Sequence, residues 1–140
     1  MSSSAQFGAT PNPGTPVTLA NAVTTLDGSG LTLANVVLTA GANGTLVPGL
    51  TVRHIGTNVA TLLRVFKNNG SDPTVAANNA LIKEIAIAAN ALSQSAASTE
   101  YYAVLNEVLH GGATPERLLV CLGTAVAAGI KVTPHNAGDY

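Results

Sequence analysis

The side chains of this chain that could do chemistry are few and far apart. The histidines are His54, His110 and His135, and the one cysteine is Cys121. A closed zinc site takes four ligands, usually with pairs of them at short spacings, and these four residues form no such pair. His54 lies on the apolar face of a predicted strand, which is typical of a core or interface histidine. His110 directly precedes two glycines and is most simply a turn residue. The sequence therefore predicts no metal ion and no cofactor.

Two polar segments resemble fragments of calcium loops. They are residues 27–30, Asp-Gly-Ser-Gly, and residues 68–72, Asn-Asn-Gly-Ser-Asp. Calcium needs about six to eight oxygen ligands, and the bidentate Glu that usually completes such a loop is missing from both. Asn, Asp, Gly and Ser are also the usual turn formers, so turns explain these segments better.

Acidic and aromatic residues gather around positions 100–107 without forming an evident active site. Glu100 and Glu107 fall on opposite faces of one predicted strand, so they cannot by themselves form the carboxylate pair of a glycosidase. Tyr101 and Tyr102 also point to opposite faces, one toward the core and one outward. The chain has no Trp, which weakens a carbohydrate-binding interpretation, and no nucleophile-elbow, dinucleotide-binding or P-loop signature is present. We expect no enzyme.

The elements that must position these residues read as short strands broken by turns. Asp27-Gly28, Asn43-Gly44 and Asn69-Gly70 are dipeptides favoured where the backbone needs positive φ, as in tight hairpins. Between the turns lie runs rich in Val, Ile, Leu and Thr. We predict strands at 17–26, 31–39, 50–55, 61–67, 81–88, 101–109, 117–123 and 129–133. About eight strands at this spacing indicate an all-β, single-domain antiparallel β-sandwich or jelly roll over residues 17–140.

Alternation assigns faces to several of these strands. Leu50, Val52 and His54 share one face, with Thr51 and Arg53 on the other. Ile130 and Val132 face inward, with Lys131 and Thr133 outward. The run 118–122 is apolar on both faces, as expected of a central strand with further structure packed outside it, and it makes Cys121 an inert core residue.

The segment 75–98 supports two interpretations. It is rich in Ala, and Leu81, Ile85 and Leu92 would form a stripe along a helix. The residues around Lys83 and Glu84 also alternate as a strand would, and periodicity cannot decide between the two in a short apolar run.

Residues 1–16 are predicted to form an extended arm, because Pro11, Pro13, Gly14 and Pro16 preclude both a helix and a central strand. Phe7 is a lone aromatic suited to docking into a neighbour's pocket. A frayed terminus is the simpler alternative. We take as candidate interface residues those of the arm and of the chain end: Phe7, Pro11, Pro13, Pro16, Asp139 and Tyr140.

The composition points to a covered surface. Charged residues make up 9% of the chain and the net charge is −1, with six Lys and Arg scattered singly. Such a distribution offers no basic footprint for nucleic acid, and no apolar stretch is long enough to cross a membrane as a helix. Because surface charge helps to keep free monomers apart, its scarcity suggests a subunit whose surface is covered by partners.

The turns and strands carry a resemblance to a known group of proteins. Its pattern is Thr-Ala-Gly-Ala-Asn-Gly-Thr at 39–45, Leu-Arg-Val-Phe-Lys-Asn-Asn-Gly at 63–70, Ala-Gly-Ile-Lys-Val-Thr at 128–133 and Gly-Asp-Tyr at 138–140. This layout is similar to small tailed-phage and prophage virion proteins of the head decoration, or cement, type, over residues 24–140. The resemblance implies a β-sandwich with a strand at 81–88 followed by a loop, and it does not extend to the arm.

The resemblance and the composition lead to one expected function. The chain is expected to be a non-enzymatic capsid decoration protein that stabilises the head shell by binding the major capsid protein. It would lie on the outer surface of the virion capsid as a homo-oligomer, with a trimer favoured. The alternative is a tail- or fibre-associated β-sandwich module that binds a host glycan or another virion protein, with Tyr101 or Tyr102 in the site.

Overall fold

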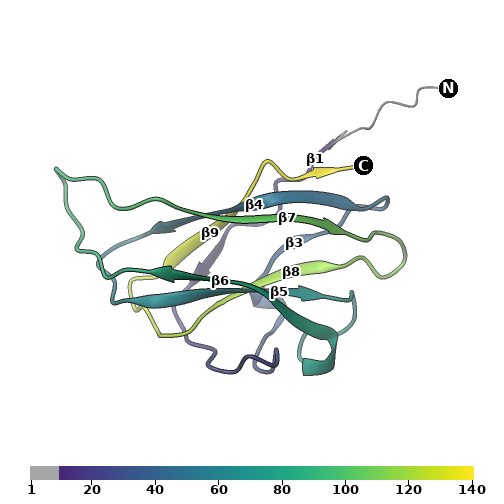
Figure 1. Ribbon diagram of the computed structural model, residues 1–140, viewed down its shortest axis with the longest axis horizontal. Helices are drawn as coiled ribbons and strands as arrows, with labels where there is room; N and C mark the ends of the chain where they lie inside the picture. The colour runs from purple at the N-terminus through teal and green to yellow at the C-terminus, as the bar shows by residue number, and fades with distance from the viewer. Residues whose placement is uncertain (1–9) are drawn as a thin grey trace.

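The fold is an antiparallel β-sandwich, seen in a computed structural model that describes residues 10–140 (Figure 1). Sheet A contains, in order, β1 (Thr10–Pro11), β10 (Gly138–Asp139), β4 (Thr45–His54), β9 (Ile130–His135) and β2 (Val17–Leu19), and β7 (Tyr101–Leu109) pairs with the other edge of β4. Sheet B has the order β3 (Val36–Thr39), β8 (Arg117–Leu122), β5 (Thr61–Asn68) and β6 (Asn79–Ile87). The predicted all-β sandwich is confirmed.

Helical structure within residues 10–140 is limited to two single turns of 3₁₀ helix, η1 (Leu33–Asn35) and η2 (Ala76–Asn78). In this part of the chain no helix is long and apolar enough to cross a membrane. The ambiguous segment 75–98 therefore contains a strand, β6, followed by a loop at 88–100. β6 forms because β5 offers it a full backbone edge, with pairs running from Thr61 opposite Ile87 to Asn68 opposite Asn79.

Two predicted strands are shorter than expected. The strand predicted at 17–26 ends at Leu19, because Leu19 pairs with Ile130, the first residue of β9, and the ladder has no partner beyond it. The strand predicted at 31–39 begins only at Val36, after η1. The chain between them leaves sheet A and crosses the outer side of sheet B, where the Val23 amide donates to the Leu122 carbonyl at 2.8 Å.

This crossing segment explains why β8 is apolar on both faces. One face of β8 belongs to the main core between the sheets, together with residues such as Leu50, Leu63 and Val132. The other face contributes Leu119 and Cys121 to a second cluster, which is closed by Phe66 of β5 and Leu31 of the crossing segment. The prediction of a central strand with further structure packed outside it is confirmed.

The three predicted turn glycines, Gly28, Gly44 and Gly70, all adopt positive φ, at 86°, 95° and 93°. None of them sits in a two-residue hairpin. Gly44 lies between β3 of sheet B and β4 of sheet A, so this turn carries the chain from one sheet to the other. At Gly70 a Cβ atom would lie 2.4 Å from the Thr114 carbonyl oxygen, so that glycine also permits a close backbone approach.

Part of the predicted arm runs along the edge of the sandwich. Thr10 and Pro11 pair with Asp139 and Gly138, and the Asn12 amide donates to the Ala137 carbonyl at 2.9 Å. Farther on, the Thr15 amide donates to the Val37 carbonyl of β3, also at 2.9 Å. Residues 10–16 are thus held by both sheets. The rest of the predicted arm, including Phe7, lies outside the described residues.

Candidate functional site on the outer face of sheet A

The outer face of β7 carries three exposed apolar side chains, Tyr102, Val104 and Val108, which are 45%, 50% and 45% exposed, with the exposed Asn106 between the two valines. Their exposure results from strand alternation, because Tyr101, Ala103, Leu105 and Leu109 of the same strand point inward and pack with the main core. We call these three residues the β7 stripe. Large apolar side chains that remain half exposed on a sheet face are typical of surfaces that contact a partner.

The phenol end of Tyr102 lies next to Gly49 of the neighbouring strand. A Cβ atom at Gly49 of β4 would be 2.6 Å from both Cζ and Oη of Tyr102, so the absence of a side chain at Gly49 makes room for the phenol ring. The Tyr102 ring forms a T-shaped contact with the ring of His135 of β9, with centroids 5.0 Å apart at an angle of 74°. His135 Nδ1 is in turn 3.5 Å from Thr51 Oγ1. Three strands of sheet A thus present an aromatic and polar cluster next to the stripe.

The strand edges next to the stripe are poorly suited to backbone pairing. Within residues 10–140, β7 pairs only with β4 and β6 only with β5, so both have one unpaired edge. In β7, Leu105 and Asn106 together oppose Pro48, and Asn106 has a φ of 50°. In β6, the register shifts at Ile82. Because bulges interrupt the ladder and twist an edge away from a neighbour, contacts here are expected to run through side chains.

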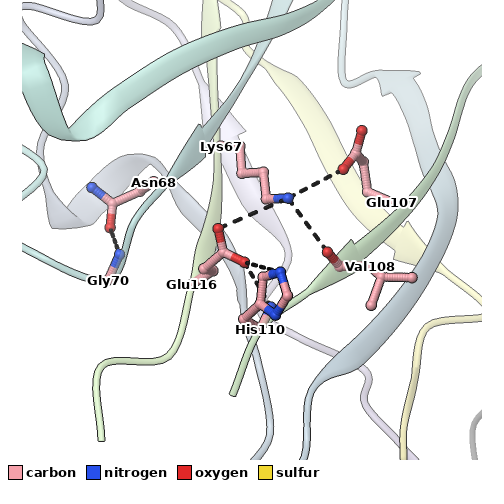
Figure 2. A network of polar contacts seen from close by, with 7 residues as sticks. All are labelled: Lys67, Asn68, Gly70, Glu107, Val108, His110 and Glu116. Atoms are coloured by element: carbon pink, nitrogen blue, oxygen red, sulfur yellow. Dashed lines mark hydrogen bonds and ion pairs between the residues drawn. The ribbon is translucent and has the colours of Figure 1, made fainter. Parts of the chain in front are cut away.

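A lysine of sheet B contacts the end of β7 and so connects the two sheets (Figure 2). Lys67 Nζ of β5 lies 3.5 Å from Glu107 Oε2 of β7, 3.8 Å from Glu116 Oε2 and 3.4 Å from the Val108 carbonyl oxygen. Glu116 also accepts a hydrogen bond of 2.7 Å from the His110 amide. Both carboxylates are therefore engaged by one ammonium group. This network positions the Val108 end of the stripe.

The remaining polar residues highlighted by the sequence lie apart from one another. Glu100 pairs with Arg53 at 2.7 Å, at the opposite end of β7 from Glu107, so the two carboxylates do not share a site. Cys121 is buried, and this burial raises the pKa of its thiol to about 11, with Arg64 acting in the other direction. Across residues 10–140, no three His, Cys, Asp or Glu side chains come together in a metal-binding arrangement.

The candidate interface residues have different surroundings. Pro11, Pro13 and Pro16 are exposed, and Pro13 and Pro16 line an open groove that runs between residues 12–18 and 33–39. Asp139 is half-buried, and its carboxylate accepts hydrogen bonds from Thr45 Oγ1 at 2.5 Å and from Asn12 Nδ2 at 2.8 Å. Tyr140 is exposed beside it. Asp139 therefore holds the chain end in place from within the molecule.

The sequence offered Tyr101 or Tyr102 as a glycan-binding candidate without deciding between them, and it did not point to Val104 or Val108. Both the odd and the even positions of the run 101–109 are apolar over much of its length, so alternation alone does not say which residues face outward.

Comparison with family models, with curated proteins and with solved structures finds no match to this chain.

Proposed function

We propose that this protein is a non-enzymatic capsid decoration protein of a tailed phage, which stabilises the head shell by binding the major capsid protein. The observation that supports this most is the β7 stripe, a row of half-exposed Tyr102, Val104 and Val108 on a sheet face. The low charge of the chain as a whole, 9% of its residues, acts in the same direction, because few ions need to be desolvated when its surface is covered. The resemblance of residues 24–140 to phage head proteins supplies the partner.

The stripe is suited to side-chain docking against a flat partner surface. Covering the exposed half of a valine stabilises a complex by about 1 kcal/mol, so two valines contribute roughly 2 kcal/mol. Tyr102 adds a larger contact area together with a hydroxyl for a hydrogen bond at the rim. The protein would act on the outer capsid surface as a homo-oligomer, and a trimer would match the three-fold positions of a capsid.

The test compares serine substitutions at equally exposed valines. The first variant carries Val104→Ser with Val108→Ser in the stripe. The control carries Val59→Ser with Val75→Ser, two valines outside β7 that are 55% and 47% exposed. Binding is measured by co-sedimentation with purified heads that lack the protein. The stripe variant should bind about thirty-fold more weakly, and the control should bind as the unmodified protein does. Equal binding by both variants would remove the stripe from the interface.

A second candidate function is supported by the cluster of Tyr102, His135 and Thr51. An exposed phenol ring beside an imidazole and a hydroxyl is a surface on which a sugar ring could stack and form hydrogen bonds. The protein would then be a tail- or fibre-associated module that binds a host glycan. A glycan array probed with the unmodified protein and with Tyr102→Ser tests this: a ligand that depends on Tyr102 supports the module, and an array without any ligand counts against it.

A further inference from the structure

The loop at 88–100 joins β6 of sheet B to β7 of sheet A and projects from one end of the sandwich (Figure 1). Beneath it lies a small cavity of about 230 Å³. One wall is formed by residues 53–56, the end of β4 and the turn after it. The opposite wall is formed by the loop itself, through Asn90, Leu92, Ser93 and residues 96–98. His54 therefore lines the cavity that this loop covers.

The imidazole of His54 is unusual among the described side chains. Both ring nitrogens, Nδ1 and Nε2, are shielded from solvent, and neither has a hydrogen-bond partner within residues 10–140. A neutral imidazole carries one donor and one acceptor, whereas a protonated one carries two donors and a charge. Burial lowers the pKa of His54, and the neighbouring Arg53 guanidinium lowers it further. Both effects favour the neutral form of the ring at neutral pH.

Tyr101 links His54 to both ends of the loop. Its ring meets the His54 ring edge-on, with centroids 5.8 Å apart at 79°. Its hydroxyl oxygen accepts a hydrogen bond of 3.0 Å from the amide of Ala88, the first residue of the loop. Tyr101 itself directly follows Glu100, the last residue of the loop. The His54 ring therefore contacts the residue that connects the two ends of the loop.

Only a few bonds hold the rest of the loop. Asn90 and Asn58 exchange two backbone hydrogen bonds, of 2.9 and 3.1 Å, and the Leu92 amide donates to Thr57 Oγ1 at 3.0 Å. The Asn58 side-chain amide also donates to the Ala88 carbonyl at 3.1 Å, and Arg53 Nη2 donates to Ser98 Oγ at 3.4 Å. Residues 91–97 are all exposed. Segments with few buried contacts and few hydrogen bonds open locally at a lower free-energy cost than the whole domain unfolds.

None of the ionisable groups around His54 provides an acceptor for a second ring proton. Arg53 precedes it on β4, and Lys131 of β9 is the register partner of Arg53, so both nearby charges on these strands are positive. Glu100 at the end of the loop is engaged by Arg53 at 2.7 Å, and Tyr101 uses its hydroxyl oxygen to accept from Ala88. A protonated His54 would be a shielded cation without a partner, an arrangement that is strongly unfavourable.

We propose that His54 is a proton-sensing residue beneath the 88–100 loop, and that the loop opens when the imidazole takes up a proton and needs water around it. Because it concerns the loop and not the β7 stripe, this device is independent of what the protein binds. Opening would uncover the end of sheet A at which β7 begins. A partner bound at Tyr102 would then lie beside a sheet end that the loop covers at neutral pH and leaves exposed at acidic pH.

Hydrogen exchange measured by mass spectrometry on the full chain tests this, at about pH 7.5 and about pH 5, with rates corrected for the intrinsic pH dependence of exchange. In the unmodified protein, protection of the amides of Ala88, Asn90 and Leu92 should fall about tenfold at the lower pH. His54→Gln, which cannot be charged, should show equal protection at both. The control His110→Gln alters an exposed imidazole and should behave as the unmodified protein does. Equal protection at both pH values in the unmodified protein would overturn the proposal.

A second measurement covers the case in which His54→Gln folds poorly. Nuclear magnetic resonance of the unmodified protein follows the ring proton of His54 and the backbone amide of Asn90 through the same titration. The proposal expects both to change with one midpoint, which lies below the ordinary histidine pKa of 6.5. An Asn90 amide that is unaffected by the His54 midpoint would contradict it.

Discussion

The side-chain amide of Asn12 donates a hydrogen bond of 2.8 Å to the carboxylate of Asp139, although 127 positions separate the two residues. The same amide donates to the Thr39 carbonyl at 3.1 Å, and the same carboxylate accepts from the buried Thr45 hydroxyl. Both ends of the described chain are therefore held at one corner of the sandwich, as Figure 1 shows. Any segment before Thr10 starts from this fixed corner.

Substitution of Asp139 tests this clamp. Asp139→Ala should lower the free energy of unfolding by about 1–3 kcal/mol, because the Thr45 hydroxyl loses its acceptor and the Asn12 amide loses one of its two acceptors. Asp139→Asn retains an acceptor oxygen and should cost less than half as much. Urea denaturation followed by circular dichroism provides the values. If the Ala variant were as stable as the unmodified protein, the clamp would have no energetic role.

A pair of truncations separates the two parts of the predicted arm. Removal of residues 1–9 should leave the stability unchanged within about 0.5 kcal/mol, because the hydrogen bonds of Asn12 and Thr15 remain. Removal of residues 1–16 should destabilise the domain by at least about 2 kcal/mol, since the pairing of β1 with β10 is lost as well. Thermal melts of the two proteins decide the point. Equal melting temperatures would mean that residues 10–16 contribute nothing to the stability of the fold. Because only the shorter deletion should leave the domain as stable as before, it is the variant with which capsid attachment by the arm is tested.

Replacement of Lys67 by Met should destabilise the protein, because Glu107 and Glu116 would then lie at the end of β7 without the ammonium group that they share. We expect a loss of about 1–2 kcal/mol that becomes smaller in high salt. Lys131→Met removes an exposed lysine on β9 and is the matched control, with an expected change below about 0.5 kcal/mol. Equal effects of the two substitutions in chemical denaturation would argue against the network.

The pH dependence of stability follows from the lowered pKa of His54. The unfolded chain takes up a proton at His54 more readily than the folded one, so protonation favours unfolding. The contribution of neutral His54 is complete above its ordinary pKa of 6.5 and declines as the pH falls below that value. Denaturation midpoints from about pH 8 to about pH 5 should therefore fall in the unmodified protein and fall less in His54→Gln. A midpoint that rises toward pH 5 would have the wrong sign for this account.

Much of the sandwich could be predicted because its signals are local. The glycine dipeptides mark the turns, and β-branched and apolar runs predict strands close to those observed at β5, β6, β7, β8 and β9. The apolar character of both faces of 118–122 correctly predicted a covered central strand. Alternation correctly placed Leu50 and Val52 on one face of their strand, which is the buried one, and Arg53 on the other.

Other features depend on contacts between distant parts of the chain. The pairing of Thr10–Pro11 with Gly138–Asp139 has no local pattern, because two residues, one of them proline, do not alternate. The early end of β2 is set by where β9 begins, at Ile130. The outward direction of Val104 follows from the register with Gly49 of β4, and the isolation of the His54 nitrogens follows from the loop folded over them.

The measurement that tests the proposed function most directly is the number of copies of this chain per purified phage particle, obtained by quantitative mass spectrometry against the major capsid protein. A capsid decoration protein predicts a ratio near one copy per capsid subunit. A few copies per particle would contradict the account and assign the chain to the tail or a fibre, and its absence from the particle would remove the virion function altogether.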